Sequence, residues 1–351
     1  MRGLPDFEVQ ICVTGQHREL LDQALGVFEI TPDVDLNLIQ PDQSLAGLTA
    51  SAVAAISSYL QTSRPDLVVV QGDTTTSFCA ALAAFYQRIP VAHVEAGLRT
   101  GNRLSPYPEE INRCLTTRLA DYHFAPTELA KENLLREGVT ESRIYVTGNT
   151  VVDALNIALR KAESAKPIPG LPAELMNGNG SKPLVLITGH RRESFGPAFE
   201  SICKAIGALA NEFPQTAFVY PVHLNPNVRK PVFDLLGSVE NVFLLEPLGY
   251  LDFINLANRS KFIMTDSGGI QEEAPTLQKQ VLLMRDTTER PEGVEAGNAT
   301  LVGTDMHKIV SEARKLLEDD HAPTVAAGPN PFGDGRASER ILQIIRNELG
   351  H

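Results

Sequence analysis

The chain has 351 residues and a formal net charge of −12 at pH 7, and its length predicts two domains. The excess of acidic residues argues against broad binding to nucleic acid or to an anionic membrane, while leaving room for a local phosphate site. The four cysteines lie far apart without a CxxC pair, which indicates neither a zinc site nor a disulfide framework. Because no apolar run approaches the ~20 residues of a spanning helix and no export signal is recognisable, we expect a cytoplasmic protein.

Short apolar runs alternate with longer amphipathic stretches along the whole chain. This alternation is typical of βαβ units and predicts an α/β fold with parallel sheets covered by helices on both faces. In the first half we expect strands at 8–14, 67–71, 91–95, 122–125 and 144–147, the first of them buried. The helical patterns between them cover 48–62, 75–88, 108–119 and 127–137.

Turn residues dominate the segment 161–182, which predicts a linker between an N-terminal domain at 1–160 and a C-terminal domain at 183–335. We expect the final helix, within 336–351, to pack back on the N-terminal domain. The second half repeats the alternation, with strands expected at 183–188, 217–221, 242–245, 262–265, 281–284 and 300–302. Ligands of such open sheets bind at the carboxyl ends of the strands, so we expect a site in a cleft between the domains.

Acidic side chains follow two predicted strands of the first half, and a third group opens a helix. Asp73 lies in a Gly-Asp-Thr-Thr-Thr-Ser segment that is equally typical of an ordinary helix cap. Glu95 ends an apolar run, and a salt bridge with Arg99 is the structural alternative. Glu109 and Arg113 are spaced i, i+4 behind a proline, which also fits the start of a charged surface helix. Together these residues are candidates for acid–base chemistry.

Histidines follow two successive strands of the second half. His190 stands in Thr-Gly-His-Arg-Arg-Glu-Ser, and His223 stands in Pro-Val-His-Leu-Asn-Pro after the next strand. Histidine and arginine at one strand end can bind phosphate or move a proton near neutral pH. A single histidine is more often structural, but two at equivalent positions favour a site.

A Ser-Gly-Gly turn between a strand and a helix is the most specific local signal. Ser267, Gly268 and Gly269 would present backbone N–H groups and the positive end of a helix dipole to an anion. Glu273, one turn later, is placed to accept hydrogen bonds from sugar hydroxyls, and Arg290 would add a charge-assisted contact. The alternative is a plain glycine-rich helix start.

Several common catalytic motifs are missing from the sequence. It contains no GxGxxG after an early strand, no GxxxxGK[ST], no HExxH and no GxSxG. Dehydrogenases of the Rossmann type, P-loop NTPases, zincins and serine hydrolases are therefore disfavoured.

Five of these segments, in this order and spacing, resemble the non-hydrolysing bacterial UDP-N-acetylglucosamine 2-epimerases. They are Gln-Gly-Asp-Thr at 71–74, His-Val-Glu-Ala-Gly-Leu-Arg at 93–99, Pro-Glu-Glu-Ile-Asn-Arg at 108–113, Gly-His-Arg-Arg-Glu at 189–193 and Asp-Ser-Gly-Gly-Ile-Gln-Glu-Glu at 266–273. The resemblance implies a GT-B fold, with two Rossmann-like domains and the nucleotide on the C-terminal one. It also implies inversion at carbon 2 of UDP-N-acetylglucosamine to UDP-N-acetylmannosamine for surface polysaccharide synthesis, without redox cofactor or metal.

The resemblance also implies roles for individual positions. Elimination of UDP to a 2-acetamidoglucal and its readdition would use proton donors and acceptors from Asp73, Glu95, Glu109 and His190, whose individual roles stay unassigned. Ser267, Gly268 and Gly269 match diphosphate contacts, Glu273 a ribose contact and Arg290 a further polar contact. Phe253 matches a segment that holds uracil through its backbone, and Arg113 and His223 match other residues of the cleft.

Members of this family usually form homodimers, and in many of them a second substrate molecule binds as an activator. Gln16, His17 and Gln43 match the activator side, whereas Glu19 and Asp42 replace the Gln and Arg of some members. Family members begin with a strand, a Gly-Thr-Arg-Pro-Glu-Ala-Ile-Lys loop and a helix, which this sequence lacks. We therefore expect Met1 to be an internal start of a longer gene and the N-terminal domain to be truncated.

Three other functions remain open at this point. The enzyme could act on a related UDP sugar such as a diacetamido-uronic acid, which the turnover of the two substrates distinguishes. A truncated chain could bind a UDP sugar without catalysis, and a GT-B glycosyltransferase would require an acceptor and leave the proton on carbon 2 unexchanged.

Overall fold

The computed structural model describes residues 4–15, 18–38, 43–162, 167–176, 182–191, 194–319 and 328–350. The chain divides into two compact units: unit 1 is Met1–Asp153 with Phe332–His351, and unit 2 is Ala154–Pro331. Within the described ranges, no helix has the length and apolar character that crossing a membrane requires.

The main sheet of unit 1 has four parallel strands in the order of the chain. They are β3 (Val68–Gln71), β4 (Val91–Val94), β5 (Tyr122–Ala125) and β6 (Ile144–Val146). The connecting helices are α3 (Thr75–Tyr86), α4 (Glu109–Leu119) and α5 (Glu128–Arg136), and a short 3-10 turn, η1 (Glu141–Arg143), precedes β6. The side chains of Thr74 and Thr127 cap α3 and α5 by accepting hydrogen bonds from the backbone N–H groups of Ser77 and Ala130.

The start of unit 1 forms a separate two-stranded parallel sheet of β1 (Cys12–Val13) and β2 (Val34–Asp35), with α1 (Arg18–Val27) between them and α2 (Leu45–Ser63) following. The prediction of a buried strand over 8–14 is wrong in extent and in burial, because only two residues are in the strand and both are half-buried. Within the described part of the chain β1 pairs with β2 alone, so few of its backbone groups take part in a ladder.

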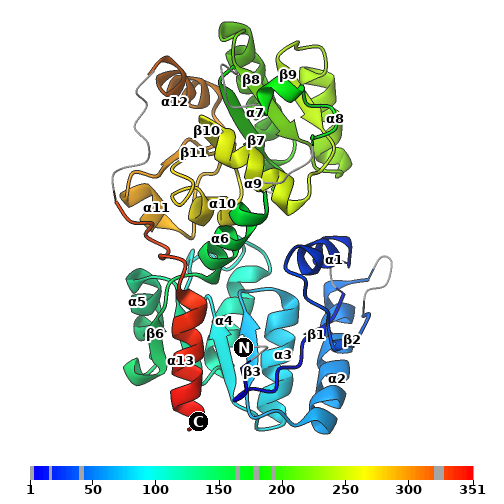
Figure 1. Cartoon of the computed structure of the whole chain (residues 1–351), viewed down its shortest axis with the longest axis vertical. Coiled ribbons are helices and arrows are strands. Elements are labelled where there is room, and N and C mark those ends of the chain that lie inside the picture. Colours follow the sequence, from blue (N-terminus) through cyan, green and yellow to red (C-terminus); the bar gives the residue numbers. More distant parts are fainter. Residues whose placement is uncertain are drawn as a thin grey trace. The chain divides into compact units, whose positions relative to one another are not determined.

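The last helix of the chain, α13 (Ala337–Leu349), belongs to unit 1 and runs along its main sheet (Figure 1). Ile341 and Ile345 of α13 pack in one cluster with Val94 and Phe124 of the sheet. The carboxylate of Asp153 accepts the backbone N–H groups of the first two residues of α13 at 3.1 and 2.8 Å, which satisfies two donors at the helix start.

The sheet of unit 2 has six parallel strands in the order β12-β11-β10-β7-β8-β9. The strands are β7 (Leu184–Thr188), β8 (Ala217–Pro221), β9 (Val242–Leu245), β10 (Phe262–Thr265), β11 (Gln280–Leu283) and β12 (Ala299–Leu301). The helices are α6 (Thr150–Ala162), which begins in unit 1, η2 (Ala173–Leu175), α7 (Pro197–Glu212), α8 (Pro226–Leu236), α9 (Tyr250–Arg259), α10 (Gly268–Glu273), α11 (Pro291–Glu295) and α12 (Met306–Glu318). This is the doubly wound order, in which the order of the parallel strands along the sheet reverses between β7 and β10, and ligands of such sheets bind in the crevice at the carboxyl ends of these two strands.

Both faces of this sheet are buried, which explains the uninterrupted apolar strands of the second half. In β7, Val185 and Ile187 belong to the core formed with α7, α8 and α12, whereas Leu184 and Leu186 belong to the core formed with α6, α9 and α10. The predicted linker 161–182 is described at 161–162, 167–176 and 182. Its Ile168, Leu171 and Leu175 are buried in the second of these cores, because apolar residues within a turn-rich segment still gain by leaving water.

Candidate functional site

Asp73 of unit 1 lies directly after β3, on a turn where Gly72 has a φ of +69°. The side-chain amide of Asn112 donates to the Asp73 carbonyl at 3.0 Å, and the guanidinium of Arg113 forms an ion pair with the Asp73 carboxylate. The Asp73 side chain is 25% exposed, whereas Arg113 is buried. The first two turns of α4 therefore hold both the backbone and the carboxylate of Asp73, and they bring Asp73 and Arg113 together.

Glu95 continues from β4 with a φ of +65°, a conformation that is uncommon for a residue with a side chain. One of its carboxylate oxygens lies 3.8 Å from the position that a Cβ on Gly72 would take, so Glu95 reaches the turn that carries Asp73. Arg99, the partner considered for Glu95, makes a bidentate pair with Glu137 at 2.6 and 2.9 Å.

Two adjacent glutamates at the start of α4 have different environments. Glu109 is half-buried, and its side chain makes no hydrogen bond or ion pair with another described residue. Glu110 is buried and accepts hydrogen bonds from the backbone N–H groups of Thr100 and Gly101 and from Arg113. Sequence reasoning singled out Glu109 and gave Glu110 no role, because two neighbouring glutamates on one helical turn are indistinguishable by spacing.

His93 supports this site from inside the β4 strand and was not singled out from the sequence. Its Nε2 donates to the carbonyl oxygen of Gly72 at 2.8 Å, one residue before Asp73. Burial lowers the pKa of His93 to about 4, so its imidazole is neutral at pH 7. His123, its register partner on β5, is also buried, and burial lowers its pKa to about 4. The sequence signal that could have identified His93 is its position within an otherwise apolar strand, Val91–Val94.

In unit 2, His190 follows β7 and His223 follows β8, and their rings stack with centroids 5.4 Å apart. Asp266, at the end of β10, is buried and accepts the backbone N–H groups of His190 and Arg191, both at 2.8 Å. The Nδ1 of His190 lies 3.6 Å from the other carboxylate oxygen of Asp266. No role was predicted for Asp266 from the sequence. In the structure, its carboxylate holds the backbone of His190 and Arg191 at the crevice between β7 and β10.

The predicted anion site of unit 2 lies on the other side of the same crevice. Ser267 is the N-cap of α10 and its side chain makes no capping hydrogen bond, while Gly268 and Gly269 form the first helical residues. A Cβ on Gly268 would lie 2.6 Å from Nη1 of Arg290 and 2.8 Å from the Glu289 carboxylate, so a larger residue there would force these buried side chains to shift.

Glu273 and Arg290 are held by protein partners. The hydroxyl of Tyr250 donates to the Glu273 carboxylate at 2.8 Å, and burial raises the pKa of Glu273 to about 7. Arg290 forms ion pairs with Glu272 and with Glu289, the latter at 2.6 Å, and all three side chains are buried. Arg290 therefore lies behind the Ser-Gly-Gly turn.

The other predicted contacts have different surroundings. Phe253 packs partly buried against the core of unit 2, and its backbone N–H donates to the carbonyl of Gly249, the N-cap of α9, at 3.0 Å.

Of the positions matched to the activator side, Gln16 and His17 lie outside the described residues. The side-chain amide of Gln43 donates to the Ser51 hydroxyl at 3.3 Å. In the part of the chain that the structure describes, no three His, Cys, Asp or Glu side chains gather as a metal site.

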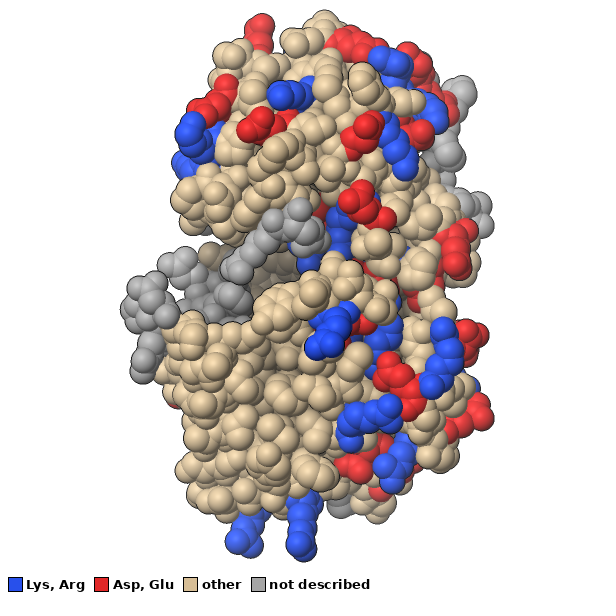
Figure 2. Space-filling model, turned by 180° about the vertical axis from the view of Figure 1, so that it is seen from behind, with Lys and Arg blue, Asp and Glu red and all other residues tan. Residues whose placement is uncertain are grey.

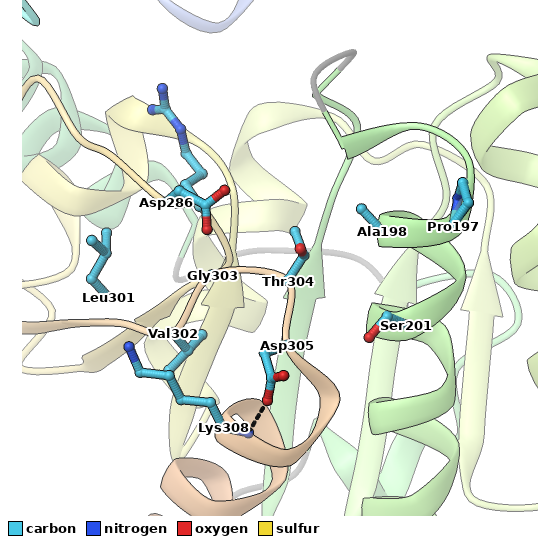
Figure 3. Close-up of a pocket in the computed structure, with 11 residues that line it drawn as sticks. Pro197, Ala198, Ser201, Asp286, Leu301, Val302, Gly303, Thr304, Asp305 and Lys308 are labelled. Carbon is cyan, nitrogen blue, oxygen red and sulfur yellow. Dashed lines mark hydrogen bonds between the residues drawn. The ribbon is translucent and has the colours of Figure 1, made fainter.

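Unit 2 also contains a pocket of about 560 Å³ beyond the carboxyl ends of β11 and β12 (Figure 3). Its walls come from the first turns of α7 and α12 and from the segments after the two strands, including Ser201, Asp286, Thr304 and Lys308. None of the predicted site residues lines this pocket.

Comparison with known proteins gives whole-length matches. A family model described as UDP-N-acetylglucosamine 2-epimerase matches residues 1–346. The UDP-N-acetylglucosamine 2-epimerase of Escherichia coli K12 is 53% identical over 345 residues, which are 98% of this chain and 92% of the relative.

Solved structures agree with these sequence matches. A Neisseria meningitidis UDP-GlcNAc 2-epimerase bound to UDP-GlcNAc has a TM-score of 0.91 and 47% identity, over 98% of this chain and 93% of its own. A Methanocaldococcus jannaschii UDP-GlcNAc 2-epimerase in complex with UDP-GlcNAc and UDP has a TM-score of 0.79 and 36% identity, over 93% and 88%. The expected α/β fold with parallel sheets is confirmed, and the chain belongs to the UDP-N-acetylglucosamine 2-epimerase family.

Proposed function

We propose that this protein interconverts UDP-N-acetylglucosamine and UDP-N-acetylmannosamine by inverting carbon 2 of the sugar. The observation that carries the proposal is the match of the whole chain to epimerases at about half of all positions. The polar residues after β3, β4, β7 and β10 support it, because they stand where ligands of parallel sheets bind.

The reaction we propose begins with removal of the proton from carbon 2 and departure of UDP from carbon 1. The product of this elimination is a 2-acetamidoglucal. UDP then adds back to carbon 1 while a proton returns to the opposite face of carbon 2, so no net oxidation occurs. Asp73, Glu95, Glu109 and His190 are the proposed proton donors and acceptors, because carboxylates and imidazole can carry out both transfers.

Unit 2 is the proposed binding site for the UDP portion. The Ser-Gly-Gly turn supports this role because backbone N–H groups at a helix start favour a diphosphate and stabilise its developing charge. The further proposed substrate contacts are Arg113 from unit 1 and, from unit 2, His223, Phe253, Ser267, Gly268, Gly269, Glu273 and Arg290.

Heavy water distinguishes this reaction from its alternatives. With UDP-N-acetylglucosamine as substrate, we expect deuterium to enter at carbon 2 and UDP-N-acetylmannosamine to accumulate to an equilibrium mixture. A UDP-binding protein without activity would bind UDP and show no exchange. A glycosyltransferase would leave the original hydrogen on carbon 2, so no deuterium would enter there. Faster turnover of a UDP-diacetamido-uronic acid would move the assignment to that sugar.

We further propose that two copies of the chain associate through unit 1. The helices α2 and α3 contain no charged residue, and Figure 2 shows a broad, largely uncharged area of unit 1 at the lower left. Phe85 and Tyr86 at the end of α3 are 57% and 61% exposed, and Ile111 and Leu115 of α4 are also exposed. Burying such side chains against a second copy removes apolar surface from water.

The cellular setting is also part of the proposal. All four cysteines are free, which fits the reducing cytoplasm, where nucleotide sugars would feed synthesis of surface polysaccharides. We propose a second molecule of UDP-N-acetylglucosamine as an activator on the side of Gln43. Initial rates that rise sigmoidally with substrate concentration would support activation, and hyperbolic rates would argue against it.

A further inference from the structure

A chain of charged side chains runs from the interior of unit 1 to the surface. Glu110 and Arg113 expose 4% and 5% of their side chains, whereas Asp73 at the outer end exposes 25%. The guanidinium of Arg113 contacts Glu110 through Nη1 at 3.2 Å and Asp73 through Nη2. Arg113 therefore lies between a partly exposed carboxylate that a substrate can reach and a buried one that it cannot.

Glu110 also organises the loop that precedes α4. Its carboxylate accepts the backbone N–H of Thr100 at 3.1 Å and that of Gly101 at 2.9 Å. A carboxylate with this many donors has a fixed position, because each buried donor left without an acceptor costs free energy. Arg113 in turn has a fixed partner on its inner side, which limits the directions its outer nitrogen can take.

We infer that Glu110 is a positioning residue for the epimerase reaction. It holds Arg113 in the orientation that aims the Asp73 carboxylate toward the substrate, while Asn112 holds the Asp73 backbone from the same helix. Glu110 itself makes no contact with the substrate in this assignment. The inference deepens the proposed function and rests on the catalytic role proposed for Asp73.

The test compares four forms of the full chain: the unaltered protein, Glu110→Gln, Asp73→Asn and the double variant. Glu110→Gln keeps the size of the side chain and one acceptor oxygen, and it removes the charge that attracts Arg113. We expect kcat to fall about tenfold to a hundredfold with little change in KM, since a displaced reacting group costs rate more than binding. In the Asp73→Asn background, Glu110→Gln should lower kcat no further, because it acts through the same carboxylate.

A matched control separates positioning from loss of structure. Asp153→Asn also alters a carboxylate that accepts two backbone N–H groups in unit 1, and it has no contact with Asp73. It should lower the melting temperature and leave kcat within twofold of the unaltered protein. Glu110→Asp retains the charge, so it should recover part of the kcat lost in Glu110→Gln. If Glu110→Gln does not fold, Glu110→Asp takes its place in the cycle with Asp73→Asn.

Three results would overturn the inference. If Asp73→Asn is impaired while Glu110→Gln keeps its kcat, positioning is wrong and the proposed function stands. If the losses of the two single variants multiply in the double variant, Glu110 acts independently of Asp73. If Asp73→Asn retains full kcat, the catalytic role of Asp73 fails together with the inference, whereas absence of carbon 2 exchange in the unaltered protein refutes the proposed function itself.

Discussion

At the scale of single residues, the groups that support the proposed active site are as buried as the hydrophobic core. His93, Glu110 and Asp266 lie 0%, 3% and 1% exposed, and each makes a hydrogen bond to the backbone of a segment that carries a predicted site residue. Polar groups persist in such positions only when they are paired. Their substitution should therefore affect stability as well as geometry.

Burial of His93 makes the stability of the protein depend on pH. Its pKa is about 4 in the folded protein and near 6.5 when the chain is unfolded, so the unfolded chain binds more protons between these values. Stability is therefore fully present above pH 6.5 and falls as the pH drops toward 4, by about 3 kcal/mol for this group. His93→Gln, which keeps a donor for Gly72, should flatten the pH dependence of the free energy of unfolding in urea. An unchanged slope would assign that dependence to other groups such as His123.

Gly268 lies close to the buried side chains of Arg290 and Glu289. Gly268→Ala would place a methyl group against the Arg290–Glu289 ion pair, and overpacking of this kind costs about 1–3 kcal/mol. The loss should appear as a lower midpoint of urea unfolding. Gly269→Ala is the matched control because its Cβ would meet nothing within 4 Å. Equal stability of the two variants would contradict the steric explanation.

At the scale of elements, the helices of each unit pack against its sheet through apolar faces. The helix α13 shows this because it is separated in sequence from the rest of unit 1 by all of unit 2. Its Ile341 and Ile345 reach the cluster of the main sheet, and Asp153 caps its first turn. The helix therefore contributes to the stability of unit 1 through a small number of identifiable contacts.

Removing one of these contacts should destabilise unit 1. Ile345→Ala deletes a side chain that is 2% exposed and should cost about 2–4 kcal/mol of the free energy of unfolding. Gln343→Ala, on the exposed face of the same helix, should cost less than about 0.5 kcal/mol. Hydrogen exchange of β4 and β5 amides should accelerate in the first variant only. Acceleration confined to unit 2 would show that α13 does not stabilise this sheet.

At the scale of the whole molecule, the two units differ in how much apolar surface they leave exposed to water. The sheet of unit 2 is buried by helices on both sides, and β7 contributes residues to both of its cores. In unit 1, the uncharged helices α2 and α3 leave aromatic side chains in contact with water. That difference is the basis for proposing association through unit 1.

Charges placed on this face should prevent association. Phe85→Glu combined with Tyr86→Glu should halve the molar mass measured by analytical ultracentrifugation at micromolar concentration, because a buried unpaired charge is costly at an interface. Leu235→Glu, on the exposed surface of α8 in unit 2, should leave the mass unchanged. If the unaltered chain is already monomeric in the same experiment, the proposed dimer is wrong.

Most elements of the fold could be predicted from periodicity, because a strand buried on both faces leaves an unbroken apolar run. The strands β5, β8, β9 and β10 begin and end where their patterns do. The failures lie at the start of the chain, where β1 is shorter than its apolar run and β2 was not predicted. Strand length there depends on the available pairing partner, which no local pattern records.

The order of five motifs in the sequence by itself determined the family, and with it the reaction to test, since residues that carry chemistry keep their type and spacing in the chain. Only the tertiary structure decided which of these residues are neighbours and what holds them. Spacing could not show that Glu110 is buried behind Arg113 while Glu109 is not, or that Asp266 fixes the loop of His190. Contacts between residues far apart in the chain depend on how sheets and helices pack. Because protein interiors are close-packed, the position of each buried side chain depends on all of its neighbours, which no local sequence pattern records.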